Sequence, residues 1–105
     1  MQSFKQKKKM GKNKIKTALF GLGRIGQMHA NNLRKNSEFE LKYVFDLNKN
    51  LSNKISKKFN TISVNNPDIA FKDNEIKCIF IASSTSTHLK FIEKGAKYKK
   101  VVFCE

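Results

Sequence analysis

Gly21-Leu22-Gly23-Arg24-Ile25-Gly26 lies where a strand pattern gives way to a helix pattern. Its G-x-G-x-x-G spacing is a weak signal by itself, because short glycine spacings arise by chance and in many turns. The context makes it stronger, since residues 15–20 form a β-prone run and residues 24–35 have helical periodicity. A strand that ends in such a turn and opens a helix predicts a phosphate-binding loop.

Each glycine of this loop has its own expected role. Gly21 allows a sharp turn after the strand, Gly23 lets the backbone approach a pyrophosphate, and Gly26 lets helix and strand pack closely. The pyrophosphate is expected over the backbone N–H groups of Arg24 and Ile25, at the positive end of the helix dipole. A purely structural turn needs one glycine rather than three at this spacing, so we favour a dinucleotide-binding function.

Asp46 supplies the acidic residue that such a loop requires, because it follows the next predicted strand about 20 residues beyond the last glycine. We expect its carboxylate to accept hydrogen bonds from the adenosine ribose and to repel a 2′-phosphate, which makes NAD the expected cofactor rather than NADP. Asp46 can instead cap the following helix, a role open also to Asn48 or Asn50. Lys49 is a nearby cation that leaves NADP as an alternative.

The rest of the chain alternates strand and helix patterns. Strands are expected at residues 15–20, 39–45, 61–64, 76–82 and 101–104, and helices at residues 24–35, 51–59, 67–71 and after Thr87, its predicted N-cap. This alternation predicts right-handed βαβ crossovers and a parallel sheet. The expected fold class is therefore α/β, a doubly wound Rossmann-type sheet of about five strands, in one domain over residues 15–105.

Apolar spacing predicts which helix faces meet this sheet. The expected sheet-facing residues are Ile25, Met28 and Leu33 in the first helix, Leu51, Ile55 and Phe59 in the second, and Leu89, Ile92 and Ala96 in the last. The apolar run at residues 78–82 is typical of a central strand covered on both faces. Gly95 weakens the helical pattern near its end.

A hydroxyl-rich segment follows that central strand, on the carboxyl edge where open α/β sheets bind ligands. We expect Ser83, Ser84 and Thr85 to meet the ribose and nicotinamide of the cofactor. The alternative is a loop and helix cap with no ligand contact. His88 is grouped with these candidate cofactor-binding residues, but neither it nor His29 has a nearby carboxylate in the sequence, so no catalytic role is expected for either.

The net charge of +14 comes mostly from lysine, since Arg24 and Arg34 are the two arginines among 105 residues. No arginine cluster suited to base contacts is present, so we do not expect nucleic-acid binding. Residues 1–14 form a basic leader, expected to be disordered, with no apolar stretch of a signal peptide, and Met10 is a second candidate start. No run approaches the roughly 20 apolar residues of a membrane-spanning helix.

Two cysteines, Cys78 and Cys104, each lie in an apolar stretch without neighbouring ligand residues. We expect both to be small buried side chains. A metal site would need close pairs, and a disulfide framework would need more cysteines in a secreted chain, so neither is expected. This usage favours a reducing, cytoplasmic compartment.

Three stretches of the chain resemble the Gfo/Idh/MocA family of oxidoreductases, and its inositol 2-dehydrogenases most of all. They are Gly-Leu-Gly-Arg-Ile-Gly-Gln-Met-His-Ala at residues 21–30, Ser-Thr-Ser-Thr-His at residues 84–88 and Val-Phe-Cys-Glu at residues 102–105. The resemblance runs from about Ile15 to Glu105. It implies hydride transfer between NAD and a ring hydroxyl of a cyclitol or sugar.

The resemblance also implies that Glu105 matches the glutamate of a Glu-Lys-Pro motif whose lysine contacts cofactor and substrate. The lysine, the proline and the substrate domain with its acid–base histidine and aspartate would come after this residue, so we expect the chain to bind NAD without catalysing hydride transfer alone. Glu105 cannot replace those groups, because no substrate wall is present. We expect an exposed apolar sheet face, and the sequence does not predict an oligomeric state.

Two alternative functions stay open. The first is a stand-alone NAD-binding or regulatory module that pairs with a separate catalytic subunit. The second is a basic nucleic-acid-binding protein that uses its leader and lysines, with an affinity that falls steeply with salt.

Overall fold

The computed structural model describes residues 14–104, apart from the side chain of Thr85. The leader expected at residues 1–14 lies outside this range except for Lys14. The elements are β1 (Ile15–Phe20), α2 (Arg24–Lys35), β2 (Phe39–Phe45), α3 (Lys49–Phe59), β3 (Ile62–Ser63), α4 (Asp68–Lys72), β4 (Ile76–Ile81), the 3₁₀ turn η1 (Thr85–Thr87), α5 (His88–Lys97) and β5 (Val101–Cys104). Each predicted strand and helix is present, although β3 is shorter than expected and α4 begins after Pro67.

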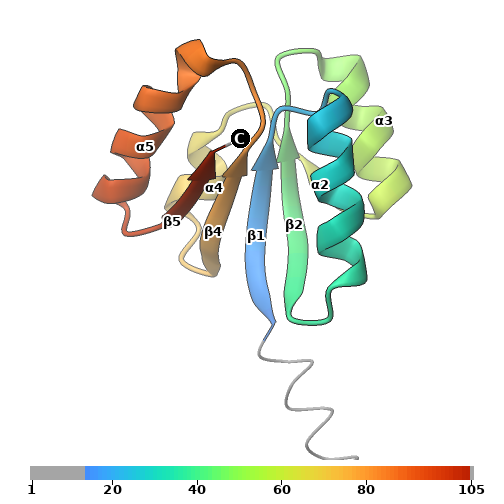
Figure 1. The fold of residues 1–105 in the computed structure, drawn as a ribbon, viewed down its shortest axis with the longest axis horizontal. Coiled ribbons are helices and arrows are strands. Elements are labelled where there is room, and N and C mark those ends of the chain that lie inside the picture. The colour runs from blue at the N-terminus through green and yellow to red at the C-terminus, as the bar shows by residue number, and fades with distance from the viewer. Residues whose placement is uncertain (1–13, 105) are drawn as a thin grey trace, which may run out of the picture.

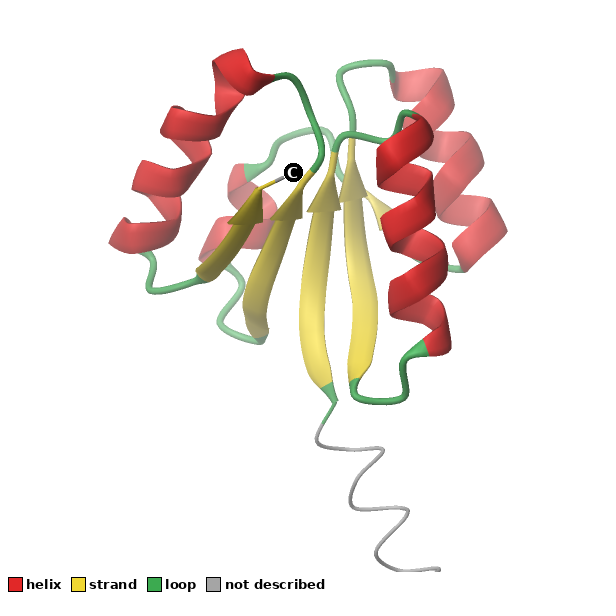
Figure 2. Ribbon diagram, viewed as in Figure 1, coloured by secondary structure: helices red, strands yellow, loops and turns green. Residues whose placement is uncertain are grey.

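The five strands form one parallel sheet in the order β3-β2-β1-β4-β5. Helices α2 and α3 pack on one face and α4 and α5 on the other, as the ribbons show (Figures 1 and 2). This is the expected doubly wound α/β sheet. The connection from β3 through α4 to β4 carries the chain from one half of the sheet to the other, so the strand order reverses between the neighbours β1 and β4. The crevice at the carboxyl ends of these two strands is where such sheets bind ligands.

The central strand β1 supplies both layers of the core, because successive side chains of a strand point to opposite faces. Ala18 and Phe20 are fully buried under α4 and α5, and Leu19 is fully buried under α2 and α3. The ring of Phe20 makes edge contacts with Phe91 at 5.0 Å and Phe71 at 5.7 Å between ring centroids. The floor of the carboxyl-edge crevice is therefore a packed aromatic cluster.

The sheet-facing stripe of α2 differs from the expected one. Gly26, Ala30 and Leu33 are buried, whereas Ile25 and Met28 are 43% and 49% exposed. Two small residues at positions i and i+4 let the helix approach β1 closely, and this approach turns the larger neighbouring side chains outward. The prediction placed the larger apolar side chains of this helix against the sheet, but the close approach of helix and strand requires small residues there. In α3 the expected Ile55 and Phe59 are buried and Leu51 is partly buried.

The apolar face predicted for α5 is also wrong. Leu89, Ile92 and Ala96 are exposed, whereas Phe91 and Gly95 are the buried residues of this helix. A Cβ atom at Gly95 would lie 2.3 Å from the Cγ2 atom of Val102 in β5, so this glycine permits the helix to lie on the sheet.

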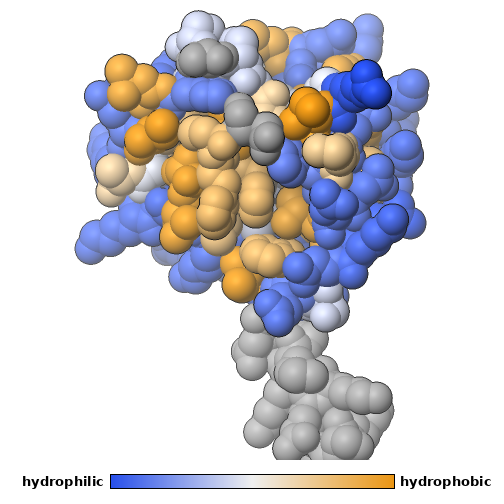
Figure 3. Space-filling model, in the orientation of Figure 1, coloured by the Kyte–Doolittle hydropathy of each residue, from blue (hydrophilic) through white to orange (hydrophobic). Residues whose placement is uncertain are grey.

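An apolar surface over β4 and β5 is uncovered on the face that α2 shares (Figure 3). Phe80 and Phe103 stack there with ring centroids 4.9 Å apart, and Phe103 and Val101 are 48% and 54% exposed. Cys104 is exposed on this edge strand, which corrects the expectation that both cysteines are buried, because β5 has a neighbour on one side. Cys78 is buried, and burial raises the pKa of its thiol.

At the amino edge of the sheet, Asp73 accepts hydrogen bonds from Lys42 Nζ at 2.6 Å and Tyr43 Oη at 2.7 Å. Burial alone would raise the pKa of Asp73, but these two hydrogen bonds lower it to about 2. Glu75 binds Lys42 at 3.1 Å and Lys16 at 3.0 Å, which ties β1 and β2 to the turn before β4.

Within residues 14–104 no helix is long and apolar enough to cross a membrane.

Candidate functional site

The loop between β1 and α2 begins with a glycine that the geometry requires. Gly21 has a φ of +91°, and a Cβ atom on it would lie 2.5 Å from the backbone nitrogen of Ser83. Its own N–H donates to the carbonyl oxygen of Phe45 at 2.8 Å, so the turn is held against both neighbouring strand ends. No side chain fits in this position without moving the loop after β4.

The other two glycines of the loop differ in what surrounds them. A Cβ atom on Gly26 would lie 1.8 Å from the carbonyl oxygen of Gly21, so the first turn of α2 packs directly on the loop. A Cβ atom on Gly23 would meet nothing within 4 Å. The fold therefore does not need a glycine at Gly23, and the open space in front of its backbone is available to a ligand.

Gly23 is also the N-cap of α2 and brings no side chain to accept hydrogen bonds from the first turn. The first amides of any helix lack intrahelical acceptors, and here they include those of Arg24 and Ile25. No acidic residue lies in the first turn of α2 to satisfy them. This end of the helix therefore presents N–H donors and a positive dipole end to the space in front of Gly23.

Asp46 lies directly after β2, where its carboxylate bridges two backbone segments. One oxygen accepts from the N–H of Leu22 at 2.7 Å, and the other accepts from the N–H of Asn48 at 2.8 Å. The cap of α3 is Asn48, whose side chain accepts from Leu51 N–H at 3.1 Å, so Asp46 is not that cap. Each carboxylate oxygen keeps a second acceptor position, and the side chain lines the adjoining pocket.

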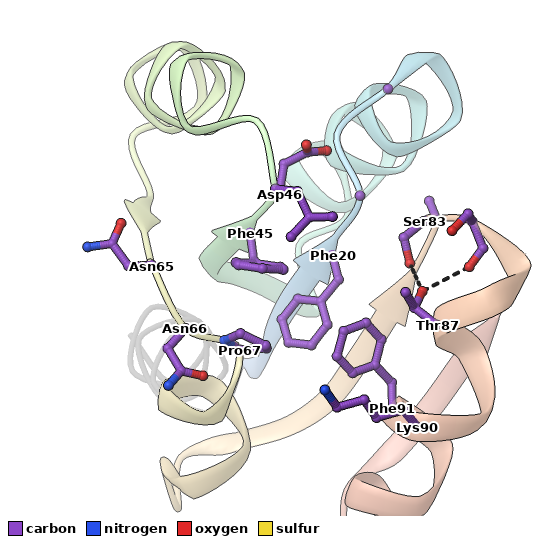
Figure 4. A pocket seen from close by; sticks show the side chains of 15 residues that line it. Phe20, Phe45, Asp46, Asn65, Asn66, Pro67, Ser83, Thr87, Lys90 and Phe91 are labelled. Carbon is purple, nitrogen blue, oxygen red and sulfur yellow. Dashed lines mark hydrogen bonds between the residues drawn. The ribbon is translucent and has the colours of Figure 1, made fainter.

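A pocket of about 660 Å³ opens at the carboxyl edge, beside the glycine loop (Figure 4). Its volume falls within the range of small-molecule sites. The residues that line it are Phe20, Gly21, Gly23, Phe45, Asp46, Leu47, Asn65, Asn66, Pro67, Ala82, Ser83, Ser84, Thr87, Lys90 and Phe91. The loops after β1, β2, β3 and β4 thus contribute to one cavity, with Phe20 and Phe91 at its base.

The segment after β4 is ordered by a relay of hydroxyl groups. Thr87 Oγ1 donates to the carbonyl oxygen of Ser84 at 2.8 Å and lies 2.7 Å from Ser83 Oγ (Figure 4). Since the single proton of Thr87 is used on Ser84, the Ser83 hydroxyl donates to Thr87. Thr87 is the N-cap residue of α5, as predicted, but its side chain makes no capping hydrogen bond to that helix. Its hydroxyl holds the pocket loop instead.

His88 begins α5, and its Nε2 atom lies 3.0 Å from the carbonyl oxygen of Ser83. A carbonyl accepts, so Nε2 carries the proton in this arrangement. His88 therefore fixes the backbone of the same loop that Thr87 holds. His29 lies in α2, 6.2 Å from the ring of Phe80, and is not a lining residue of the large pocket.

Five of the eleven candidate residues line this pocket: Gly21, Gly23, Asp46, Ser83 and Ser84. Arg24 and Ile25 begin α2 directly after Gly23. Gly26 and His88 do not line the pocket but pack on or bind the loops that do, Gly26 on the backbone of Gly21 and His88 on the carbonyl oxygen of Ser83. The side chain of Thr85 and all of Glu105 lie outside the described residues. Among residues 14–104 no group of three potential ligands is placed to hold a metal ion.

Sequence reasoning missed the residues that enclose the pocket on its other side. Asn65 and Asn66 follow β3, and the rule that ligands bind at the carboxyl ends of parallel strands would have singled them out. Leu47 is 86% exposed, which is unusual for a leucine, but exposure is not visible in a sequence. Lys90 carries no sequence signal, because it is one of many lysines.

Comparison with known proteins agrees with this geometry. The model of the Gfo/Idh/MocA family, an oxidoreductase family with an NAD-binding Rossmann fold, matches residues 15–105. Myo-inositol 2-dehydrogenase of Thermotoga maritima is 30% identical over 92 residues, which are 87% of this chain and 28% of that protein. The chain thus spans little more than a quarter of the length of this relative.

Solved structures show the same relationship. A myo-inositol dehydrogenase from Corynebacterium glutamicum has a TM-score of 0.81 and 32% identity, and the match covers 87% of this chain and 27% of that one. GenD2 from gentamicin A biosynthesis, solved in complex with NAD, has a TM-score of 0.84 at 20% identity, and the match covers 88% of this chain and 26% of that one. The second likeness concerns the fold alone.

Proposed function

Because the chain belongs to the Gfo/Idh/MocA family of oxidoreductases through its NAD-binding Rossmann domain, we propose that it binds NAD in the carboxyl-edge pocket. The observation that carries this proposal is the open space at Gly23. A backbone position that a Cβ atom could occupy freely is nevertheless a glycine, and it faces unsatisfied helix amides. A pyrophosphate would use both the space and the donors.

The residues present fit the cofactor along the length of the pocket. The amides of Arg24 and Ile25 would hold the pyrophosphate, and Gly21 and Gly26 would shape the turn beneath it. Asp46 would accept from the adenosine ribose with the positions its oxygens keep beyond Leu22 and Asn48. When bound, NAD supplies the acceptor or donor of the hydride.

The loop after β4 would line the path to the nicotinamide. We propose that the backbone of Ser83, Ser84 and Thr85 contacts this half of the cofactor, with His88 holding the Ser83 carbonyl in place. Glu105 is proposed as a cofactor-binding residue on the resemblance of residues 102–105 alone.

A single methyl group tests the proposed site. Gly23 has φ and ψ angles of −71° and −161°, which an L-residue adopts without strain. We expect Gly23→Ala to keep the fold and to weaken NAD binding at least tenfold in titration calorimetry, because the methyl group occupies the pyrophosphate space. Unchanged NAD affinity in a folded Gly23→Ala variant would refute this location.

The preference for NAD over NADP is proposed on the charge of Asp46. Asp46→Asn retains one acceptor oxygen for Leu22 N–H but removes the negative charge that opposes a 2′-phosphate. We expect the variant to bind NAD several-fold more weakly than the unchanged chain does. We also expect the difference between its affinities for NAD and NADP to be smaller. If NADP binds the unchanged chain as tightly as NAD, the proposed selectivity is wrong.

For the whole protein we propose hydride transfer between NAD and a ring hydroxyl of a cyclitol or sugar, in the cytoplasm. The support is the similarity to myo-inositol dehydrogenases, together with the two free thiols, Cys78 and Cys104, which suit a reducing compartment. The test is NADH formation from myo-inositol and related cyclitols by the chain joined to the substrate domain of a relative. No NADH from any cyclitol or sugar would count against this substrate class.

A further inference from the structure

Gln27 lies outside the pocket but binds the glycine loop at two points. It is half-buried in α2 and does not line the cavity. Its backbone N–H donates to the carbonyl oxygen of Gly23 at 2.9 Å, and its side-chain Nε2 atom lies 3.0 Å from the carbonyl oxygen of Leu22. Because a carbonyl oxygen only accepts, the side-chain NH₂ group is the donor to Leu22. One residue thus binds the two successive carbonyls on either side of the Gly23 N–H.

These contacts fix the direction of the peptide group between Leu22 and Gly23. On one side Leu22 donates its N–H to Asp46 at 2.7 Å, and on the other its carbonyl accepts from Gln27. The C=O and N–H of a trans peptide point in opposite directions, so the N–H of Gly23 points away from Gln27. Within residues 14–104 this N–H donates to no protein acceptor. It is therefore available to a ligand.

The carbonyl oxygens of the loop, in contrast, are all turned toward α2. The carbonyl oxygen of Gly21 lies against Gly26, where a Cβ atom would be 1.8 Å from it. The next two carbonyls, of Leu22 and Gly23, bind Gln27. A carbonyl oxygen carries partial negative charge and repels a pyrophosphate, whereas an N–H group attracts one. The side of the loop away from the helix is thus free of these acceptors.

The glycine at position 23 makes this arrangement easy to lose. A flip of the peptide group before Gly23 would take its φ from −71° to a positive value, which a glycine adopts as readily as a negative one. In the flipped form the carbonyl of Leu22 would point where the N–H of Gly23 points now. A loop that keeps a glycine there for open space therefore needs another residue to hold the peptide.

We propose that Gln27 is a positioning residue for the pyrophosphate of the cofactor; this inference rests on the proposed NAD site. By holding the Leu22 carbonyl on the helix side, Gln27 directs the N–H of Gly23 at the pyrophosphate. This N–H acts as a third donor beside the amides of Arg24 and Ile25. Gln27 itself does not touch the cofactor. Without its side-chain bond the flipped peptide is populated, and the affinity falls in proportion to the loss of the binding form.

The test compares ligands with and without a pyrophosphate. NAD and ADP-ribose carry one, and adenosine, which would use the Asp46 end of the site, does not. We expect Gln27→Met to weaken NAD and ADP-ribose by about fivefold in titration calorimetry, the effect of one net hydrogen bond. Adenosine binding, followed by amide chemical shifts, should not change. A general loss of structure would instead weaken all three ligands.

Gln27→Glu tests the direction of the hydrogen bond through its pH dependence. A carboxylate has nearly the same shape but cannot donate to the Leu22 carbonyl, whereas the protonated acid, with an ordinary pKa of about 4.3, can. The variant should bind NAD more weakly than the unchanged chain at neutral pH, and the difference should narrow toward about pH 4. The deficit of Gln27→Met should stay constant. A Gln27→Glu deficit that does not narrow would overturn the inference.

Asn31→Met is the matched control, because Asn31 is an exposed amide one turn further along α2 that does not line the pocket. It should bind every ligand like the unchanged chain. Unchanged NAD affinity in the Gln27→Met variant overturns the inference while the proposed function stands. Equal weakening of adenosine and ADP-ribose also overturns it, because Gln27 would then only support the fold. If the unchanged chain binds no NAD, the proposed function fails and this inference with it.

Discussion

The amino and carboxyl edges of the same sheet differ in how their polar groups are used. At the amino edge, Asp73 takes hydrogen bonds from Lys42 and Tyr43, and Lys100 donates to the carbonyl oxygens of Asp73 and Ile76 at 2.7 and 2.8 Å. At the carboxyl edge, the helix amides after Gly23 face a pocket of about 660 Å³.

The polar groups at the amino edge of the sheet serve mainly stability, and those at the carboxyl edge serve mainly binding. Polar groups that satisfy each other inside the protein stabilise the fold and are unavailable to a ligand. Polar groups that face a cavity contribute little to the fold and are available for binding. We therefore expect substitutions at the amino edge to lower stability, and substitutions at the carboxyl edge to lower binding, except where a glycine builds the edge itself.

The largest expected loss of stability is at Gly26, a glycine that builds the carboxyl edge. Gly26→Ala would ordinarily favour a helix by up to about 1 kcal/mol. Here the new methyl group meets the carbonyl oxygen of Gly21, so we expect unfolding free energy to fall by about 3 kcal/mol or more, measured by urea denaturation. Gly23→Ala is the matched control and should cost less than about 1 kcal/mol. If both variants lost the same unfolding free energy, Gly26 would not be a more important structural glycine than Gly23, and this account of the loop would be wrong.

Asp73 gives the next largest effect. Its folded-state pKa of about 2 lies below the ordinary value of 3.8, so its stabilisation is present above pH 4 and is lost as the pH falls toward 2. The shift corresponds to about 2 kcal/mol, and Asp73→Asn should lose about this much at pH 7. The stability curves of variant and unchanged chain should converge near pH 2.

Glu75→Gln is the control for this network, because Glu75 binds Lys16 and Lys42 from an exposed position with 60% of its side chain accessible. It should change stability much less than Asp73→Asn. The account of the amino edge would be contradicted if NAD affinity fell in either variant while the fold stayed intact.

The smallest expected effect is at the loop after β4. Thr87→Val removes the hydroxyl that links Ser83 and Ser84, and we expect a loss of about 1 kcal/mol in thermal unfolding, with a modest loss of NAD affinity. Ser86→Ala removes the exposed bond to Ser84 Oγ and should have little effect. A larger effect from Ser86→Ala would show that the relay through Thr87 does not order this loop.

The fold was predictable because hydrophobic periodicity and the glycine spacing point to the same architecture. The parallel sheet and both helical layers follow from the βαβ alternation and its handedness. The order β3-β2-β1-β4-β5 does not, because doubly wound sheets with the same alternation have more than one strand order. The inward faces of α2 and α5 were not predictable from apolar content, because Gly26, Ala30 and Gly95 pack closely by being small. Their contact depends on the distance between helix and sheet, which periodicity does not report.

The site was predictable where local sequence determines local geometry. The glycine loop and Asp46 come from adjoining elements, and their relative placement follows from one βαβ unit. Asn66 and Lys90 meet in the pocket only through the packing of α4 against α5, across 24 residues of chain. Side chains brought together by tertiary packing leave no spacing signal in a single sequence.

The binding of NAD at the carboxyl edge can be mapped directly by recording amide chemical shifts of the isotope-labelled chain during titration with NAD. We predict the largest changes at Leu22, Gly23, Arg24 and Ile25, with further changes at Leu47 and Ser83, and no change at Lys42, Asp73 or Lys100. Shifts confined to the amino edge, or none in a folded chain, would contradict the account.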